Sequence, residues 1–292
     1  MDLPKCKNCD HESNAKDGVC SLKKASDGLL LRCVGDWSKA KHYYLERYIN
    51  AFTTSMKKKW QLYYIDLFTG PGKCVIRETE DEIDGSPMIA LNAPFPFSGY
   101  YFVELNEEVF NALSVRCKKH ANYNRVKLFH GDCNSVIDDI MRDIPPRSLS
   151  LAFVDPTGLQ FKFSTLKKLA QRKVDLIITF PEGMAIKRNF QKFLEQSKSL
   201  LDDAVGDNGW RQFNKGKEII EYYRKKLGSL EYQEVKLGEE ILIRSSTKKS
   251  PLYCLLFASK NQLGHKFWHE ISKTEHTGQR KFDFENFSNP TS

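Results

Sequence analysis

The hydrophobic and polar positions of the chain follow two different periods. Residues 38–56 place apolar side chains three or four positions apart, which predicts a helix with one buried face. From residue 61 onward, short apolar runs alternate with amphipathic segments instead. Five of these runs predict strands: 62–67, 100–104, 126–129, 149–154 and 174–180. Strands separated by crossover segments form a mainly parallel sheet that is covered by helices on both faces, so the sequence predicts an α/β fold.

The segments between and after these strands complete the pattern. Short helices are expected over 86–91, 107–119, 134–142, 164–171 and 265–273. Residues 73–85 are polar and partly acidic, and we expect a loop there. Residues 186–230 have a helical pattern and predict an insertion after the fifth strand. The apolar runs 240–244 and 252–258 are joined by a loop that is too short for a crossover helix, so they are expected to pair antiparallel.

This pattern divides the chain into three parts. Residues 1–36 are predicted to be a small Cys-rich module, 37–275 a Rossmann-like domain, and 276–292 a polar tail. No apolar run approaches the ~20 residues that a membrane helix needs. The first residues contain no apolar signal segment. We therefore expect a cytoplasmic protein that is not attached to a membrane.

Four of the eight cysteines crowd into the predicted N-terminal module. Their spacing is Cys6-x2-Cys9-x10-Cys20-x12-Cys33. One CxxC pair with two further cysteines suits tetrahedral Zn²⁺, so we predict a structural zinc site. An iron–sulfur cluster and unliganded thiols are the alternatives. A disulfide framework is not expected in a chain without an export signal.

The net charge of the chain indicates which kind of partner it could bind. Its formal net charge is +8 at pH 7. A basic surface favours polyanions, so RNA or DNA is a candidate substrate or partner. Charge alone leaves this open, because many basic proteins bind no nucleic acid.

Candidate chemistry gathers where the predicted strands end. Four consecutive strands end in or beside a carboxylate: Asp66, Glu104, Asp132 and Asp155. Ligands of an open α/β sheet bind at the carboxyl ends of its strands. Glu104 is placed to accept both hydroxyls of a ribose, and Asp132 to accept the amino hydrogen of an adenine. Asp66 is a candidate acceptor for loop N–H groups or for a ligand amine.

The turn after the first strand supports the same interpretation. It has the sequence Asp66-Leu67-Phe68-Thr69-Gly70-Pro71-Gly72, in which Gly70 and Gly72 let the backbone approach a ligand closely. We assign this turn, with Phe68 in it, to cofactor binding. NAD fits less well, because its fingerprint has three glycines and an acid about 20 residues further on. Here there are two glycines, and Glu104 lies 32 residues beyond Gly72. A phosphate-binding P-loop is excluded, since no Gly-Lys-Ser/Thr follows the strand.

Beyond these features, the chain resembles known families. Asp-Leu-Phe-Thr-Gly-Pro-Gly is similar to the first motif of class I S-adenosylmethionine-dependent methyltransferases, and Asp155-Pro156-Thr157-Gly158 to their fourth. Over 37–273 the chain resembles the bacterial three-Cys-motif partner family (TcmP). The matching stretches are Trp37-Ser38-Lys39-Ala40-Lys41-His42, Tyr64 to Gly72, Gly85-Ser86-Pro87-Met88-Ile89-Ala90-Leu91, Phe153 to Gly158, and Tyr253-Cys254-Leu255-Leu256-Phe257-Ala258. Gly85-Ser86-Pro87 is also similar to ribosomal-RNA adenine-N6 methyltransferases.

The resemblance implies a Rossmann-like class I methyltransferase fold, in which a mainly parallel seven-stranded sheet has an antiparallel last strand. It also implies S-adenosylmethionine as the cofactor and a protein partner that bears a three-cysteine motif. Amino-methylating enzymes of this class use an Asp/Asn-Pro-Pro-aromatic motif, whose aromatic ring stacks on a flipped base. Here Asp155-Pro156 is retained and Thr157-Gly158 replaces the rest. Asp155 and Pro156 are therefore the candidate catalytic residues, with Asp155 orienting the acceptor.

Two functions remain open from the sequence. One is an S-adenosylmethionine-dependent methyltransferase that acts on a base of RNA or DNA. The other is a methyltransferase-like scaffold without catalytic activity, which binds nucleic acid or a protein partner.

Overall fold

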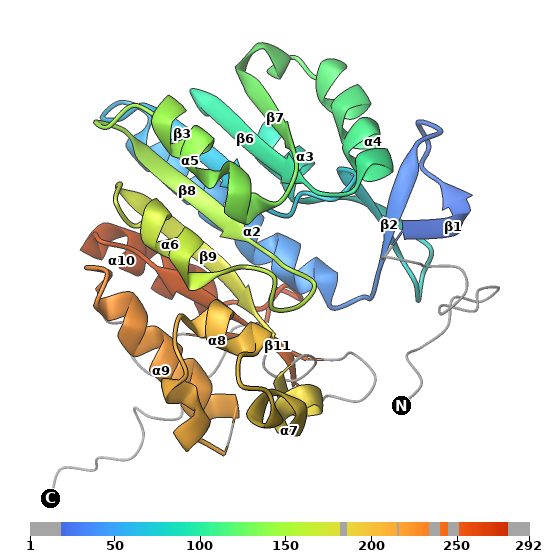
Figure 1. The fold of residues 1–292 in the computed structure, drawn as a ribbon. Coiled ribbons are helices and arrows are strands. Elements are labelled where there is room, and N and C mark those ends of the chain that lie inside the picture. Colours follow the sequence, from blue (N-terminus) through green and yellow to red (C-terminus); the bar gives the residue numbers. More distant parts are fainter. Residues whose placement is uncertain (1–18, 182–185, 215, 234–239, 245–250, 280–292) are drawn as a thin grey trace, which may run out of the picture.

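Two sheets and the helices around them make up the fold (Figure 1). The computed structural model describes residues 19–181, 186–214, 216–233, 240–244 and 251–279. The larger sheet has seven strands in the order β10-β11-β9-β8-β3-β6-β7. The smaller sheet has four strands in the order β1-β2-β4-β5.

The larger sheet contains the five strands that the apolar runs predicted. They are β3 (Leu62–Asp66), β6 (Gly99–Glu104), β7 (Val126–His130), β8 (Leu149–Val154) and β9 (Val174–Phe180). All of them pair in parallel. β11 (Pro251–Ala258) pairs antiparallel with both β9 and β10 (Ile241–Arg244), which confirms the predicted antiparallel pair. The larger sheet is thus seven-stranded and mainly parallel, with an antiparallel last strand.

The strand order places a crevice at one edge of this sheet. From β3 the chain builds outward through β6 to β7, and it then returns to add β8 on the other side of β3. This reversal is the topological switch point of a doubly wound fold, where the carboxyl ends of neighbouring strands leave room for a ligand. The chain therefore has the α/β Rossmann-like architecture that the sequence predicted.

Helices cover both faces of the larger sheet (Figure 1). One apolar core unites the strands with α5 (Cys133–Asp143), α6 (Phe163–Leu169), α8 (Leu200–Val205) and α9 (Gly216–Gly228). A second core on the other face contains residues of α2 (Ser38–Met56), α3 (Ser86–Leu91), α4 (Glu107–Lys118) and α10 (Gln262–Ser272). Because both faces are covered, all seven residues of β9 are buried.

The insertion after β9 is helical in its described part, as predicted. It comprises α7 (Lys187–Glu195), α8, a 3₁₀ turn (Gly209–Gln212) and α9. A further 3₁₀ turn (Tyr123–Arg125) leads into β7. Trp210 of the insertion is fully buried in the core that contains α5 and α6. Within the described residues, none of the helices combines the length and the apolar character needed to cross a bilayer.

The smaller sheet corrects one prediction. Residues 73–85, expected to be a polar loop, contain β4 (Lys73–Ile76) and β5 (Glu82–Asp84). β4 pairs in parallel with β2 (Leu30–Val34), which in turn pairs antiparallel with β1 (Val19–Lys24). The three residues after Lys73 are buried, but this apolar run is short and an acidic stretch follows it, so the polar character dominated the sequence pattern.

The predicted zinc ligands fall in two groups. Cys6 and Cys9 lie outside the described residues, as do residues 280–292 of the predicted tail. Cys20 and Cys33 are buried and pack with Ala25, Leu31 and Val75 between β1, β2 and β4. Among the described residues there is no group of three or more side chains that could hold a metal ion. The zinc site therefore stays a prediction.

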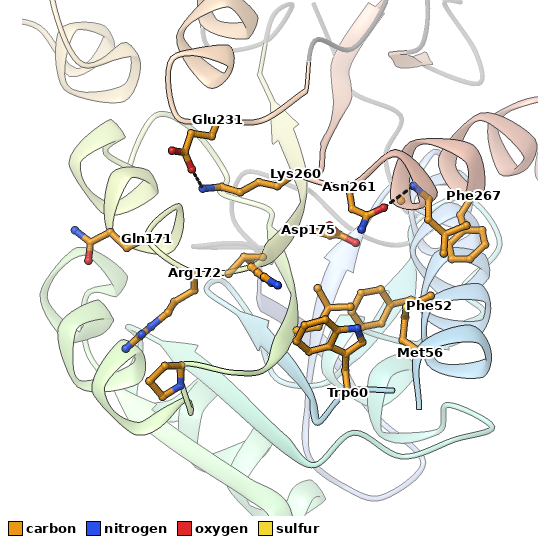
Figure 2. Close-up of a pocket in the computed structure, with 16 residues that line it drawn as sticks. Phe52, Met56, Trp60, Gln171, Arg172, Asp175, Glu231, Lys260, Asn261 and Phe267 are labelled. Atoms are coloured by element: carbon orange, nitrogen blue, oxygen red, sulfur yellow. Dashed lines mark hydrogen bonds and ion pairs between the residues drawn. The ribbon is translucent and has the colours of Figure 1, made fainter. Parts of the chain in front are cut away.

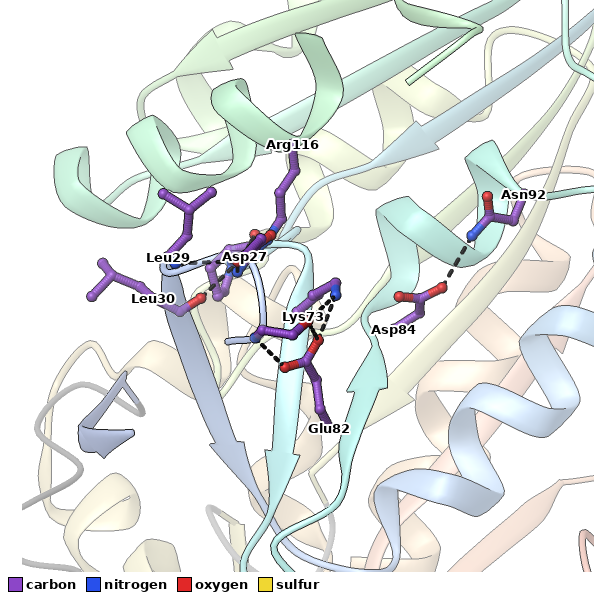
Figure 3. A network of polar contacts seen from close by, with 10 residues as sticks. Asp27, Leu29, Leu30, Lys73, Glu82, Asp84, Asn92 and Arg116 are labelled. Atoms are coloured by element: carbon purple, nitrogen blue, oxygen red, sulfur yellow. Dashed lines mark hydrogen bonds and ion pairs between the residues drawn. The ribbon is translucent and has the colours of Figure 1, made fainter. Parts of the chain in front are cut away.

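One guanidinium ties the smaller sheet to the larger one (Figure 3). The Arg116 side chain on α4 is 3 % exposed and donates to both carboxylate oxygens of Asp27, at 2.8 and 2.9 Å. It also donates to the Leu30 carbonyl at 2.9 Å and to the Pro71 carbonyl. The hydrogen bonds from Arg116 lower the pKa of Asp27 to about 2, although burial acts against them. Arg116 thus holds the turn between β1 and β2 and the bend after β3 in one place.

We expect Arg116→Met to destabilise the protein by about 3 kcal/mol, because it leaves Asp27 and two carbonyls without their buried donor. Urea unfolding monitored by circular dichroism measures the change. The matched control is Arg142→Met, which removes an exposed arginine from α5 and should change stability very little. Equal effects of the two substitutions would contradict the anchoring role of Arg116.

Candidate functional site

A glycine bend follows β3. Phe68 and Thr69 just before it line the cavities described below, whereas Gly70 and Gly72 line neither of them. Gly70 has φ +63° and Gly72 has φ +91°, values in the left-handed region that glycine adopts without strain. A Cβ on Gly72 would lie 3.3 Å from side-chain carbons of Arg116 and Leu113, so the bend also packs closely against α4. The two glycines that the sequence singled out are therefore required by backbone geometry and by packing.

Glu104 fixes this bend from the neighbouring strand. Its Oε2 accepts a hydrogen bond from the Gly70 N–H at 2.9 Å, and its Oε1 accepts one from the Asn106 N–H at 2.9 Å. The parallel register aligns Asp66 with Phe102, so Glu104 at the end of β6 lies beside the bend. The predicted juxtaposition of Glu104 and the glycine turn is present.

Asp132 completes the same crevice. It is the N-cap of α5, and its Oδ1 accepts hydrogen bonds from the backbone N–H and the side-chain amide of Asn134, at 3.0 and 2.8 Å. Glu104 and Asp132 line one cavity of about 580 Å³, together with Phe68, Asp155 and others. This volume lies in the range of ligand pockets for nucleotide-sized molecules.

Asp66 lies beneath this cavity and does not line it. Its side chain is 0 % exposed, and its Oδ1 accepts a hydrogen bond from the Phe68 N–H at 3.2 Å. Burial raises the pKa of Asp66 to about 7, although the Ser86 hydroxyl and the Phe68 N–H favour the ionised form. The structure thus places at the first strand end a carboxyl group that changes its charge near neutral pH.

The pKa of Asp155, at the end of β8, is shifted in the opposite direction to that of Asp66. Its Oδ2 accepts a hydrogen bond and ion pair from the Lys41 Nζ on α2, and both side chains are mostly buried. Burial raises the pKa of Asp155, but the Lys41 ammonium more than compensates and holds the pKa below its usual value. Asp155 is therefore ionised at neutral pH, and one of its oxygens is already engaged.

A second cavity, of about 330 Å³, adjoins the first and shares Asp155, Phe68 and Arg32 with it. Pro156 and His42 line it as well. Burial and the nearby Lys41 ammonium lower the pKa of His42 to about 3, so its imidazole is neutral, and its Nδ1 has no hydrogen-bond partner in the described part of the chain.

Several side chains in this second cavity were missed by sequence reasoning. They are Arg32, Trp37, Lys41, Arg77, Ser86 and Tyr253. Most of them lie in stretches that matched the TcmP pattern, so the resemblance marked their neighbourhood without giving them a role. Arg77 lay in the segment expected to be a loop, and no sequence signal distinguished it.

A third cavity lies at the opposite edge of the sheet (Figure 2). It measures about 500 Å³ and is lined by the first residues of β8 and β9 and by aromatic residues that include Phe52 and Trp60. The buried Asp175 there accepts a hydrogen bond from the Tyr48 hydroxyl at 2.8 Å. Because ligands of this fold bind at the carboxyl ends of the strands, we place the functional site at the first two cavities.

Comparison with known proteins gives likenesses of structure only. No family model matches the chain, and no curated protein matches its sequence. A DUF519 protein from Legionella pneumophila has a TM-score of 0.49 at 14 % identity, with 82 % of this chain and 92 % of that chain covered. The O-methyltransferase TomG from Streptomyces achromogenes, solved with SAM, has a TM-score of 0.44 at 10 % identity, with coverage of 78 % and 82 %. TYW2 of P. horikoshii, solved with MeSAdo, has a TM-score of 0.40 at 13 % identity, with coverage of 84 % and 73 %. Membership of the TcmP family stays a prediction.

The raised pKa of Asp66 predicts a pH-dependent stability. The folded chain holds the Asp66 proton more tightly than the unfolded chain, so this stabilisation is present at low pH and is lost as the pH rises through about 7. Between pH 6 and pH 8, wild type should lose about 1 kcal/mol more unfolding free energy than Asp66→Asn. Urea titrations at the two pH values measure the difference. Parallel pH dependences of the two proteins would show that Asp66 does not titrate near 7.

Proposed function

We propose that the chain is an S-adenosylmethionine-dependent methyltransferase whose cofactor occupies the cavity at the carboxyl ends of β3, β6 and β7. The observation that carries the proposal is the hydrogen bond from the Gly70 N–H to Glu104, with Asp132 lining the same cavity. Glu104, which ends β6, is hydrogen-bonded to the glycine bend, and Asp132 follows β7. The first acid is complementary to the ribose hydroxyls of an adenosine and the second to its adenine amino group.

The residues divide the recognition of this cofactor among them. Glu104 would accept hydrogen bonds from the ribose hydroxyls, and Asp132 from the adenine amino group. Phe68 and the 68 % exposed Leu105 offer apolar surface at the cavity wall. Asp66 does not line the cavity, so in this proposal it supports the bend by accepting a hydrogen bond from the Phe68 N–H and does not contact the cofactor. Bound in this cavity, S-adenosylmethionine supplies an electrophilic methyl group.

The acceptor belongs, in this proposal, in the second cavity beside Asp155 and Pro156. Asp155 is ionised and held by Lys41, so one carboxylate is fixed in direction where an amine or hydroxyl of the acceptor would donate. Direct methyl transfer depends mostly on such positioning. We propose a nucleic-acid base as the acceptor, because the net charge of +8 favours a polyanion.

One observation favours a second function, a scaffold without catalysis. The Lys41 ion pair already engages the carboxylate that the acceptor would need, and Thr157-Gly158 replaces the usual Pro-aromatic pair. In that case the same site would serve recognition of nucleic acid or of a protein partner with a three-cysteine motif, as the TcmP resemblance implies.

Cofactor binding is tested by isothermal titration calorimetry with S-adenosylmethionine. We expect wild type to bind and Glu104→Gln to bind at least about tenfold more weakly, which corresponds to ~1.4 kcal/mol. The matched control is Glu108→Gln, since Glu108 is exposed on α4 and does not line the cavity. Absence of heat with wild type at millimolar ligand would refute the proposal.

Catalysis is tested by transfer of a radiolabelled methyl group to total RNA, DNA and protein. We expect incorporation into nucleic acid by wild type and a loss of about 100-fold or more in Asp155→Ala. Rates are compared at saturating S-adenosylmethionine, because Asp155 also lines the cofactor cavity. Binding of the cofactor without any incorporation would favour the scaffold, and incorporation only into protein would overturn the proposed acceptor.

A further inference from the structure

A buried guanidinium lines the second cavity, and the described part of the chain supplies no counter-ion for it. Arg77 follows β4 and is only 4 % exposed. Its backbone N–H donates to the Val34 carbonyl at 2.9 Å, which fixes the start of the side chain. Its Nε has no hydrogen-bond partner in the part of the chain that the structure describes. No described carboxylate forms an ion pair with it.

The acids nearest in the sequence and in the cavity form no ion pair with Arg77 within the described ranges. Asp155 is paired with Lys41. The Glu78 Oε2 accepts a hydrogen bond from the Asp36 N–H at 2.9 Å, and its Oε1 is buried without a partner among the described residues. A buried charge without a partner is costly, and a protein retains such a group when a ligand compensates it. Because the described residues give Arg77 no carboxylate partner and its Nε no acceptor, the geometry points to an anion from outside.

Trp37 acts as a positioning residue for this guanidinium. The Arg77 Cζ lies 4.9 Å from the centroid of the Trp37 ring, in a cation–π contact. A Cβ on Gly35 would lie 2.2 Å from the indole, so glycine at this position lets the ring lie against the backbone. The ring thus restricts the guanidinium plane, while the donors at its edge stay available to the cavity.

A second arginine and other unused polar atoms lie around the same space. Arg32 lines both cavities and has no ion pair within the described ranges. The Tyr253 hydroxyl and the His42 Nδ1 also line the second cavity without hydrogen-bond partners there. Two guanidinium groups and two neutral polar atoms form a lining suited to an oxyanion attached to a polar molecule.

From this arrangement we propose that Arg77, assisted by Arg32, binds a phosphate of a nucleic-acid acceptor in the second cavity. The inference rests on the proposed function for its distinction between donor and acceptor. Arg77 lines only the second cavity, whereas Glu104 and Asp132 line the first, so the oxyanion is assigned to the acceptor and not to the carboxylate of the methyl donor. The planar fork of a guanidinium matches the oxygens of a phosphate.

The test measures two affinities in each variant. Fluorescence anisotropy with labelled 12-nucleotide single strands of RNA and DNA, of mixed sequence, measures the acceptor side at several salt concentrations. Calorimetry with S-adenosylhomocysteine measures the donor side. The variants are Arg77→Gln, the less buried Arg32→Gln as a second probe of the same cavity, and Arg147→Gln as the control. Arg147 is exposed just before β8, at the opposite edge of the sheet.

We expect Arg77→Gln to weaken strand binding about tenfold and to reduce the salt slope by about 0.7, the loss of one phosphate contact. Arg32→Gln should act in the same direction on strand binding, and Arg147→Gln should change little. Neither Arg77→Gln nor Arg147→Gln should alter S-adenosylhomocysteine affinity, because neither residue lines the first cavity. Equal losses in Arg77→Gln and Arg147→Gln, or no strand binding by wild type, would overturn the inference. A selective loss of S-adenosylhomocysteine affinity in Arg77→Gln would assign the oxyanion to the donor instead.

The two proposals fail in different ways. If wild type binds no S-adenosylhomocysteine, the methyltransferase proposal fails, while the strand measurements still decide whether Arg77 contacts a phosphate. If wild type binds S-adenosylhomocysteine and the strand measurements do not distinguish Arg77 from Arg147, only the phosphate assignment fails.

Discussion

The hydrogen bond from the Gly70 N–H to the Glu104 carboxylate is the contact on which the site depends. It joins the ends of two neighbouring strands and fixes a bend whose glycines adopt left-handed conformations. Arg116 holds the same bend from α4 through the Pro71 carbonyl, and with Asp27 it ties the bend to the smaller sheet. A turn held from both sides has little freedom to change its shape, so under the proposed function the cavity would be formed in advance of binding. Such preorganisation lowers the entropic cost of recognition.

Two buried acids show how the fold controls charge in this region. Asp66 and Asp155 end neighbouring strands, yet burial raises the pKa of the first to about 7, while Lys41 holds the pKa of the second below its usual value. The difference arises from the partner that each acid has. Asp66 has only neutral hydrogen-bond donors, and Asp155 has an ammonium group. Both arrangements cost stability unless a ligand or an ion pair compensates them, which is typical of functional sites. Arg77 is a buried cation in a similar situation. Its burial also costs stability unless a ligand compensates its charge.

The sequence was sufficient for the features that local patterns determine. Apolar runs predicted β3, β6, β7, β8 and β9, and a short connecting loop predicted the antiparallel pairing of β10 and β11. Because the predicted strands are parallel, their carboxyl ends lie at the same edge of the sheet, and the acids at these ends were expected there. The failures concern contacts made across the fold. β4 was missed because its apolar run is short, and its stability comes from pairing with β2. The surroundings of Lys41, His42 and Arg77 are formed where α2 and the smaller sheet pack near the strand ends. The periodicity of the sequence does not predict this packing.

We propose that Glu104 and Asp132, at the ends of β6 and β7, hold an adenosyl group between them. A crystal structure of the protein with S-adenosylhomocysteine tests it most directly. We expect ribose hydroxyls within hydrogen-bond distance of Glu104, the adenine amino group beside Asp132, and the glycine bend in its present conformation. Density for the ligand in the cavity beside Trp60 and Asp175, or away from Glu104, would contradict it.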